Sequence, residues 1–214
     1  KAQWIDERAS LLPLIEKVLA SGNYVGGKDV EEFETEVAKL CGAQYAVALN
    51  SGTDALSCAM YAMGIGSGDE VITTPNSFVA SAASIVQVGA KPVFVDVSAD
   101  QNINVDLIES AVTTKTRAIM PVHLTGRIAK MSEILEIGKN HNLQIVEDAA
   151  QAIGSRYKGQ LSGSFGNTGC FSTHPLKNLN ACGDGGFVTT NDKYIAEKIS
   201  LRRNHGLIDR NLVD

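Results

Sequence analysis

The chain has 214 residues, of which 44% are hydrophobic and 20% are charged, a composition that is ordinary for a soluble globular protein. Its formal net charge is −5 with acidic and basic residues interspersed, which excludes the basic surface of a nucleic-acid-binding protein. No apolar run reaches the roughly 20 residues that span a bilayer and the first residues lack the order of a secretory signal, so we expect a cytoplasmic protein without a membrane partner.

Two amphipathic helices are predicted near the start of the chain. Apolar residues recur at helical spacing over residues 11–20 and again over residues 30–40, and a glycine follows each segment. The glycine-rich stretch 22–27 between them is interpreted as a plain helix connection rather than a ligand loop.

From residue 45 onward, apolar runs of strand length alternate with helical or polar segments such as 54–63 and 131–139. The runs are 45–50, 70–74, 92–97, 117–123, 143–147, 170–173 and 186–190. This alternation is typical of βαβ units, and continuously apolar strands indicate helices on both faces of the sheet. We therefore predict an α/β fold, a three-layer α/β/α sandwich around a mostly parallel seven-stranded sheet. In such sheets the ligand lies beyond the carboxyl ends of the strands, so the residues after each run are the candidates.

Small residues follow the first apolar run and lead into a predicted helix. The sequence from Asn50 through Gly52 and Thr53 to Asp54 places a strand, a tight turn and a helix N-terminus in succession. Backbone N–H groups and the helix dipole at such a turn favour an anion such as a phosphate. An ordinary helix cap by Ser51, Thr53 or Asp54 is the alternative interpretation.

Two further candidates follow the second and fourth runs. Phe78 stands at a strand end, where it would either join the core or stack on a planar ring in the cleft. His123 would be either a ligand or base, or a histidine whose hydrogen bonds are satisfied by the backbone, which is the commoner outcome.

Asp148 directly follows the buried run that ends at Glu147. A carboxylate that emerges from an apolar strand is costly unless it meets a cationic partner, so this position predicts one. The alternative is that Asp148 caps the next helix.

Lys177 lies in a turn punctuated by Pro and Gly between two strand-like runs. A lysine amine attacks a carbonyl only when its surroundings lower its pKa, and a short loop at a sheet rim offers such surroundings. A solvated surface lysine is the alternative.

Together, these candidates fit the needs of one cofactor, pyridoxal phosphate. Its aldehyde requires a lysine, and its pyridine nitrogen requires a carboxylate so that the protonated ring can accept electrons. Its phosphate requires an anion site, and its ring requires a flat apolar face. A turn at Gly52, an aromatic Phe78, a carboxylate Asp148 and an amine Lys177 at one rim would meet these four needs.

The sequence also resembles the DegT/DnrJ/EryC1/StrS family of nucleotide-sugar aminotransferases, within fold-type I of the pyridoxal-phosphate enzymes. The resemblance covers nearly the whole chain and is specific because many short motifs recur in order. They are NSGTDA at 50–55, GDEVI at 68–72, PVFVD at 92–96, PVHL at 121–124, EDAAQA at 147–152, FSTHPLKN at 171–178, GDGG at 183–186 and NHG at 204–206.

The resemblance implies a role for each matching residue. Lys177 would form the internal aldimine with the cofactor and later move a proton between the substrate carbon and the cofactor. Asp148 would pair with the pyridinium nitrogen, Gln151 would hydrogen-bond the ring hydroxyl, and Phe78 would stack on the ring. Some proteins of this fold are dehydratases with histidine in place of the lysine; here the lysine is present and His174 lies three residues earlier.

The resemblance also implies how the phosphate is held and how the chain is organised. Gly52, Thr53 and Ser172 would donate to the phosphate, and one further contact would come from a neighbouring subunit, which implies a homodimer. Residues 1–214 would form the cofactor-binding large domain, with N-terminal helices in 1–42, and a C-terminal small domain would lie outside the chain. Because the first residue is not Met, we expect a segment of a longer polypeptide that is incomplete for turnover.

The expected function is transfer of an amino group from an amino acid, with L-glutamate as the expected donor, to a keto-deoxysugar carried on a nucleoside diphosphate. One alternative is another fold-type I enzyme, a lyase, desulfurase or decarboxylase, and the other is a non-catalytic cofactor-binding regulatory domain.

The cysteines bear on the desulfurase alternative, because such an enzyme needs a mobile catalytic thiol. Cys41, Cys58, Cys170 and Cys182 lie far apart without CxxC spacing, which predicts free thiols and no metal site. Cys182 is near Lys177 in sequence, but we expect it to be a buried structural thiol.

Overall fold

The computed structural model describes residues 2–208, which form two compact units divided between Phe33 and Glu34. The first unit contains α1 (Ala2–Ser21) and the start of α2 (Lys28–Cys41). Both predicted helices are confirmed, and α1 begins earlier than the pattern at 11–20 indicates. None of the described residues of α1 is buried, although Trp4 and Leu19 are among several large apolar side chains along it.

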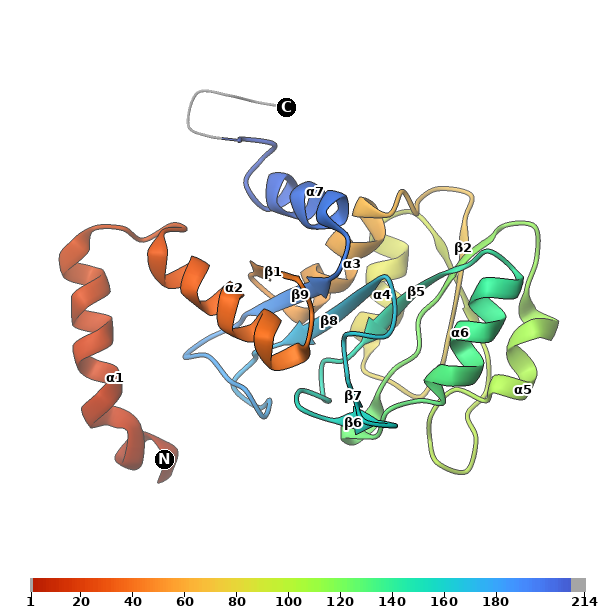
Figure 1. The fold of residues 1–214 in the computed structure, drawn as a ribbon, viewed down its shortest axis with the longest axis horizontal. Helices are drawn as coiled ribbons and strands as arrows, with labels where there is room; N and C mark the ends of the chain where they lie inside the picture. Colours follow the sequence, from red (N-terminus) through yellow and green to blue (C-terminus); the bar gives the residue numbers. More distant parts are fainter. Residues whose placement is uncertain (1, 209–214) are drawn as a thin grey trace. The chain divides into compact units, whose positions relative to one another are not determined.

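The second unit is built on a seven-stranded sheet whose strands match the seven predicted apolar runs (Figure 1). They are β1 (Tyr45–Leu49), β2 (Glu70–Thr73), β3 (Lys91–Phe94), β4 (Thr116–Ile119), β5 (Gln144–Asp148), β8 (Thr168–Ser172) and β9 (Gly186–Thr190). The strand order is β1-β9-β8-β5-β4-β2-β3, and β9 runs antiparallel to both of its neighbours while the other pairs are parallel. The predicted mostly parallel sheet is therefore confirmed.

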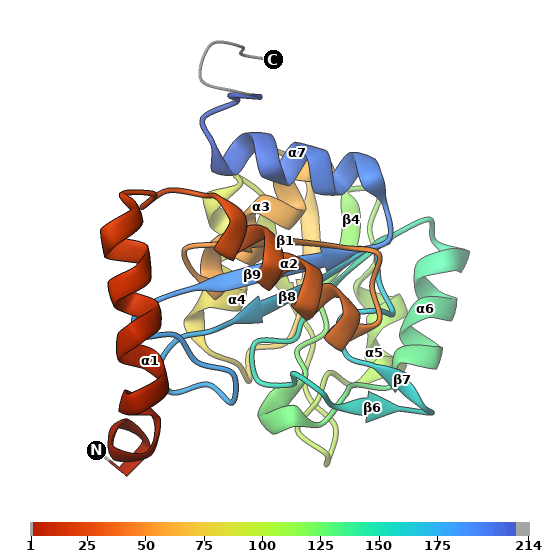
Figure 2. The ribbon, with the colours of Figure 1, turned by 60° about the vertical axis from the view of Figure 1, so that its left-hand side comes forward.

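Helices cover both faces of this sheet. One face carries α3 (Gly52–Ala62), α4 (Val79–Gln87) and α7 (Lys193–Arg203), and Figure 2 shows α3 and α7 together on it. The other face carries α5 (Val105–Ile108), followed by the 3-10 helix η1 (Glu109–Ala111), and α6 (Met131–Asn140). The predicted three-layer α/β/α arrangement is thus present.

The strands are apolar throughout because successive side chains pack on opposite faces. Val71 and Val146 join the cluster under α3, α4 and α7, whereas their neighbours Ile72 and Ile145 join the cluster under α5 and α6. Each strand therefore serves two cores, which is why its sequence shows no polar alternation.

A short hairpin of β6 (Arg156–Tyr157) and β7 (Gln160–Leu161) is a feature that the sequence pattern did not indicate. Lys158 and Gly159 connect the two strands, and both have positive φ angles, as a tight hairpin turn requires.

The parallel register places several loops at one rim of the sheet. The carboxyl ends of β1, β2, β5 and β8 point the same way, so the segments that follow them lie at one edge. These segments begin at residues 50, 74, 149 and 173. They carry most of the candidates from the sequence. Among residues 2–208, no helix is long and apolar enough to cross a membrane.

Candidate functional site

Asp148 is the last residue of β5, and its side chain is 5% exposed. Its Oδ2 accepts a hydrogen bond of 2.6 Å from the Ser81 hydroxyl, and its Oδ1 accepts one of 3.2 Å from the Ala150 N–H. Burial raises the pKa of Asp148, and these two hydrogen bonds, followed by the nearby His123 and Lys177, oppose the rise only in part. The next element after Asp148 is the strand β6 rather than a helix, so the capping alternative was wrong.

Ser81 is a partner of this carboxylate that the sequence did not single out. It lies in the first turn of α4 and is 1% exposed. Its Oγ is also 2.6 Å from the Ser77 Oγ. Since the ionised carboxylate can only accept, the Ser81 hydroxyl donates to Asp148 and must accept from Ser77.

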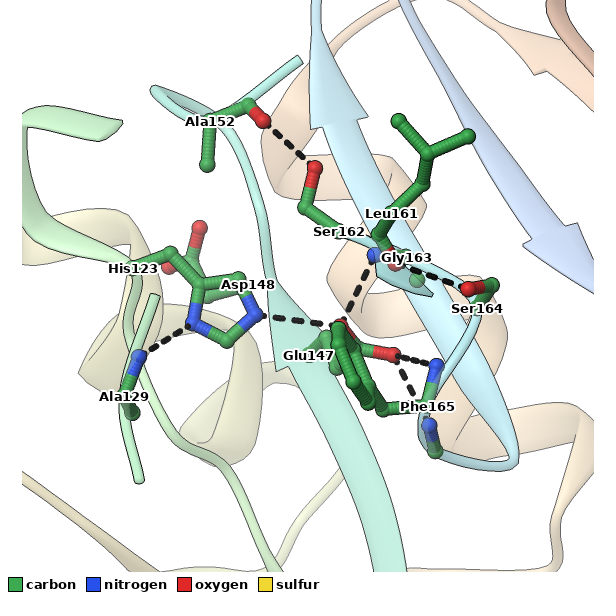
Figure 3. Close-up of polar contacts among 12 residues, drawn as sticks. His123, Ala129, Glu147, Asp148, Ala152, Leu161, Ser162, Gly163, Ser164 and Phe165 are labelled. Carbon is green, nitrogen blue, oxygen red and sulfur yellow. Dashed lines mark hydrogen bonds and ion pairs between the residues drawn. The ribbon is translucent and has the colours of Figure 1, made fainter. Parts of the chain in front are cut away.

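His123 and Glu147 form a fully buried pair beside Asp148 (Figure 3). The imidazole Nε2 is 3.0 Å from Glu147 Oε2, and its Nδ1 accepts a hydrogen bond from the Ala129 N–H at 3.3 Å. A ring nitrogen that accepts from a backbone N–H carries no proton, so the His123 Nε2–H is the group that donates to Glu147. The expected backbone partner of His123 is confirmed, and Glu147 is the additional partner.

Glu147 also accepts three backbone hydrogen bonds from the loop that precedes β8. The N–H groups of Gly163, Phe165 and Gly166 donate to its two oxygens at 2.7 to 2.8 Å, and Figure 3 shows this loop around the carboxylate. With His123 this gives four donors, which satisfies a buried charge without a cation. Glu147 is thus a structural anion, unlike its neighbour Asp148.

Gln151 lies beyond β5, where the Thr125 N–H donates to its Oε1 at 2.8 Å. Thr125 has a φ of 55°, a left-handed conformation that a β-branched residue rarely adopts. It belongs to the 3-10 turn η2 (Leu124–Gly126). Because the amide oxygen of Gln151 is used by a backbone donor, its NH₂ group is left to donate elsewhere.

Lys177 is half-buried in the loop between β8 and β9. The loop is closed at its base by the backbone of Thr173, which accepts from Ala181 and donates to Gly185 at 2.8 Å each. The Lys177 N–H donates to the His174 carbonyl at 2.8 Å and closes a turn before it. Lys177 and Gln151 line one open pocket of about 300 Å³, together with Thr125, Leu176 and Asn178.

The predicted anion turn lies at the N-terminus of α3. Ser51 Oγ accepts from the Asp54 N–H at 3.0 Å, so the ordinary cap is present. The N–H groups of Gly52 and Thr53 are the first two of the helix and have no partner within it. A Cβ on Gly52 would lie 2.7 Å from the Ser172 Cβ, so these two residues are in contact and only glycine fits.

Phe78 is the N-cap residue of α4 and is 70% exposed. It does not join the core, so the interpretation of this aromatic as a core residue was wrong. The same short segment therefore presents Phe78 to the outside and holds Ser81 against Asp148.

The structure thus connects the predicted residues in three local groups at one rim. Gly52 touches Ser172, Gln151 and Lys177 share a pocket, and the charge of Lys177 acts on Asp148. Among the described residues, no group of three His, Cys, Asp or Glu side chains could hold a metal ion.

One expectation about the cysteines is corrected. Cys182 is exposed rather than buried, and it stands between Ala181 and Gly185, the two residues that bond the backbone of Thr173. The other three, Cys41, Cys58 and Cys170, are buried free thiols.

Comparison with known proteins gives relatives over almost the whole chain. A dTDP-3-amino-3,4,6-trideoxy-alpha-D-glucose transaminase from Streptomyces venezuelae is 44% identical over 207 residues, 96% of this chain and 55% of its own length. A UDP-N-acetyl-3-dehydro-alpha-D-glucosamine 3-aminotransferase from Acidithiobacillus ferrooxidans is 45% identical over 94% of this chain and 57% of its own. The chain therefore spans about half the length of the curated relatives that it matches.

Solved structures give the same result for the fold. The structure of DesV from S. venezuelae, in complex with a ketimine intermediate, superposes with a TM-score of 0.95 at 42% identity. The match covers 99% of this chain and 57% of that one. Ntda from Bacillus subtilis, solved with bound cofactor PMP, superposes with a TM-score of 0.92 at 32% identity over 98% of this chain and 48% of that one.

These neighbours give the seven-stranded α/β domain the fold of the large domain of type I aminotransferases. The family model for the DegT/DnrJ/EryC1/StrS aminotransferase family matches residues 6–213. The chain belongs to the DegT/DnrJ/EryC1/StrS aminotransferase family.

Proposed function

We propose that this chain is the cofactor-binding part of a pyridoxal-phosphate-dependent nucleotide-sugar aminotransferase. The observation that carries the proposal is Asp148, a buried carboxylate with only neutral hydrogen-bond donors, at the rim that also carries Lys177 and the α3 N-terminus. A carboxylate in that situation favours a cation next to it.

The residues present fit the cofactor on two independent points. Burial raises the pKa of Asp148, and a protonated pyridine nitrogen would place a positive charge in direct contact with this carboxylate. At the other end, the contact between Gly52 and Ser172 brings a helix N-terminus and a hydroxyl together, as a phosphate group requires.

When bound, pyridoxal phosphate supplies an electron sink that stabilises negative charge on the carbon next to the amino group. The chain would supply the groups around it. Lys177 would hold the cofactor aldehyde carbon and, as a free amine, move a proton to and from the substrate carbon. Asp148 would keep the ring nitrogen protonated, and the Gln151 NH₂ group would donate to the ring oxygen. Phe78 would cover one face of the ring and exclude water from it.

The names of relatives support a sugar nucleotide as the amino acceptor. Those relatives include transaminases of dTDP-linked and UDP-linked sugars, and a 44% identical spore coat polysaccharide biosynthesis protein, SpsC, from Bacillus subtilis. We propose a nucleoside-diphosphate keto-sugar as acceptor, an amino acid such as L-glutamate as donor, and a role in polysaccharide or amino-sugar synthesis. A homodimer in the cytoplasm completes the proposal.

A regulatory role is the second candidate, because two relatives carry names of that kind. One is a pleiotropic regulatory protein from Geobacillus stearothermophilus, 43% identical over 95% of this chain. The other is the erythromycin biosynthesis sensory transduction protein EryC1 from Saccharopolyspora erythraea, 41% identical over 96%. The presence of Lys177 beside the pocket favours the enzyme, since a binding scaffold needs no amine there.

The experiment that separates these functions uses the protein at its natural full length. Pyridoxal phosphate is added, the visible spectrum is recorded with and without L-glutamate, and a nucleoside-diphosphate keto-sugar follows. Conversion to pyridoxamine phosphate by glutamate and back by the sugar supports the aminotransferase, and Lys177→Ala should abolish both. The control is Lys193→Ala, which removes an exposed lysine at the start of α7 that does not line the pocket.

Three other outcomes have distinct meanings. Cofactor binding without any response to amino acids would favour the regulatory candidate. Conversion of free cysteine to alanine with a persulfide left on Cys182 would favour a desulfurase, because that thiol is exposed. No cofactor binding by the full-length protein would overturn the proposal.

A further inference from the structure

The segment between β2 and α4 makes a hydrogen-bonded chain that ends on Asp148. The Ser77 hydroxyl lies 2.6 Å from the Ser81 hydroxyl, and the Ser81 hydroxyl lies 2.6 Å from Asp148 Oδ2. Ser81 and Asp148 are both buried, so water does not compete for the bond between them. Each hydroxyl has one proton, and the carboxylate fixes the direction in which both are donated.

We propose that Ser81 is a positioning residue for the ring nitrogen of the cofactor, because its hydroxyl orients the Asp148 carboxylate and favours its ionised form. The inference rests on the proposed function only for the identity of that ring. Ser81 itself would touch neither the cofactor nor the substrate. Ser77 would donate to the Ser81 hydroxyl and so help to orient it.

The geometry favours this role over simple packing. The Ala150 N–H holds Oδ1 at 3.2 Å, so the shorter Ser81 bond is the contact that fixes the second oxygen. A buried serine in a helix otherwise bonds its own backbone, and Ser84 on the same helix does so, donating to the Ser81 carbonyl at 3.1 Å. Ser81 instead bonds a side chain 67 positions later in the chain.

The same segment also carries Phe78, the aromatic that we propose for the ring face. Phe78 caps α4 and its carbonyl accepts from the Ser81 N–H at 3.2 Å. This single turn therefore determines where Phe78 and Ser81 lie relative to each other. A shift of this turn would move both at once.

Several titratable groups act on Asp148 and enter any pH dependence. His123 follows β4, Glu147 precedes Asp148 on β5, Cys170 lies on the neighbouring β8, and Lys177 follows β8. His123 is hydrogen-bonded to Ala129 and Glu147, and burial raises the pKa of the Cys170 thiol well above its usual range. His123 and Lys177 both oppose the rise in the pKa of Asp148, and both are unchanged in the variants below.

The first test measures the protonation of Asp148 in the cofactor-free full-length protein by carbon-13 NMR of labelled aspartate. Ser81→Ala should raise the pKa of Asp148, since a bond to the ionised form is lost, and Ser81→Thr should restore it by keeping a hydroxyl. The matched control is Ser84→Ala, which removes an equally buried hydroxyl from the same helix and should leave that pKa unchanged.

The second test measures the dissociation constant for pyridoxal phosphate as a function of pH. Ser81→Ala should weaken binding by about tenfold, in line with a hydrogen bond to a charged group. The loss should grow as the pH falls, because the protonated carboxyl no longer attracts the pyridinium. Ser77→Ala should shift both measurements in the same direction by less, and it replaces Ser81→Ala as the test if that variant does not fold.

Equal effects of Ser81→Ala and Ser84→Ala on the Asp148 protonation would overturn the inference, and so would failure of Ser81→Thr to restore it. If the wild-type protein does not bind pyridoxal phosphate at all, the proposed function fails. The NMR comparison still decides the role of Ser81 in that case, because it needs no cofactor.

Discussion

Neighbouring residues on β5 show how two carboxylates on one strand come to differ. Glu147 has four N–H donors and Asp148 has one hydroxyl and one N–H, although both are buried. Their side chains point to opposite faces of the sheet, as strand geometry requires. Glu147, on the face away from α4, has enough hydrogen-bond donors to offset the burial of its charge. Asp148, on the face toward α4, does not.

Glu147 should therefore matter for stability more than for chemistry. Glu147→Ala leaves His123 and three backbone N–H groups without their acceptor, so we expect a loss of about 3–5 kcal/mol in the free energy of unfolding. Urea titration followed by circular dichroism measures it. Glu136→Ala, an exposed glutamate on α6, should change stability by less than about 0.5 kcal/mol. A similar small effect of Glu147→Ala would contradict the account.

Asp148, unlike Glu147, should lower the stability of the cofactor-free protein. Because its pKa is raised by burial in the folded state, its ionised form destabilises the fold, fully so above the raised pKa. Below the ordinary value of 3.8 the carboxyl is neutral in both states and the penalty disappears. Asp148→Asn should therefore be more stable than wild type at pH 8 and lose this advantage as the pH falls through that window.

Thermal unfolding at several pH values measures this advantage, and binding of pyridoxal phosphate should be lost in the same variant. A variant that is less stable than wild type at pH 8 would mean that the carboxylate is already satisfied, which contradicts the proposed site.

The cysteines make a third prediction at the scale of single residues. Burial raises the pKa of Cys41 to about 12, with a smaller contribution from the charge of Glu147, and burial also raises the pKa values of Cys58 and Cys170. Only Cys182 is exposed among the four. A thiol reagent at pH 8 should therefore modify one thiol in the native protein and four in urea, and Cys182→Ser should remove the native reaction. Native modification of two or more thiols would contradict the structure.

At the scale of elements, the loop that precedes β8 depends on close packing of a glycine. A Cβ on Gly163 would lie 2.4 Å from the ring of Phe171, which is stacked on Phe187 at 4.6 Å and cannot move aside. Gly163 also has a φ of 78°. Gly163→Ala therefore combines backbone strain with a clash in the core.

Gly154 separates these two effects because its φ is 76° and no atom lies within 4 Å of its Cβ position. Gly154→Ala should cost about 1 kcal/mol of unfolding free energy through strain alone, and Gly163→Ala should cost about 1–3 kcal/mol more. Chemical denaturation of both variants measures the difference. Equal losses would show that the Phe171 ring gives way.

The elements also show what sequence patterns could and could not predict. The seven strands were predictable because each is a continuous apolar run that serves two cores, as Val71 and Ile72 do. The β6–β7 hairpin was not, because strands of two residues are too short for any alternation to appear. Its turn at Lys158 and Gly159 was the available signal, but it lacks the Asn-Gly or Asp-Gly pair that marks such turns.

The candidate site also contains features that the sequence could predict and features that it could not. The positions of Asp148 at a strand end and of Lys177 in a tight loop were predictable because each follows an apolar run of strand length. Ser81 was not, since nothing local distinguishes it from Ser84, and its partner lies on a strand far along the chain. The orientation of Gln151 depends on Thr125 in a left-handed turn, which no propensity predicts for a β-branched residue.

At the scale of the whole molecule, the described chain is a family member that spans about half the length of its curated relatives. Three groups of residues at one sheet rim, around Gly52, Gln151 and Asp148, would meet the phosphate, the ring oxygen and the ring nitrogen of one cofactor. Lys177 would bind the aldehyde carbon of the same cofactor, because it shares the pocket with Gln151 and its charge acts on Asp148.

The measurement that tests this central claim most directly is covalent trapping. The full-length protein is mixed with pyridoxal phosphate, reduced with borohydride, digested and mapped by mass spectrometry, with Asp148→Asn alongside. The account predicts a pyridoxyl group on the peptide that contains Lys177 in the wild-type protein and a much lower yield in Asp148→Asn. A label spread over exposed lysines, or one that is unaffected by Asp148→Asn, would contradict it.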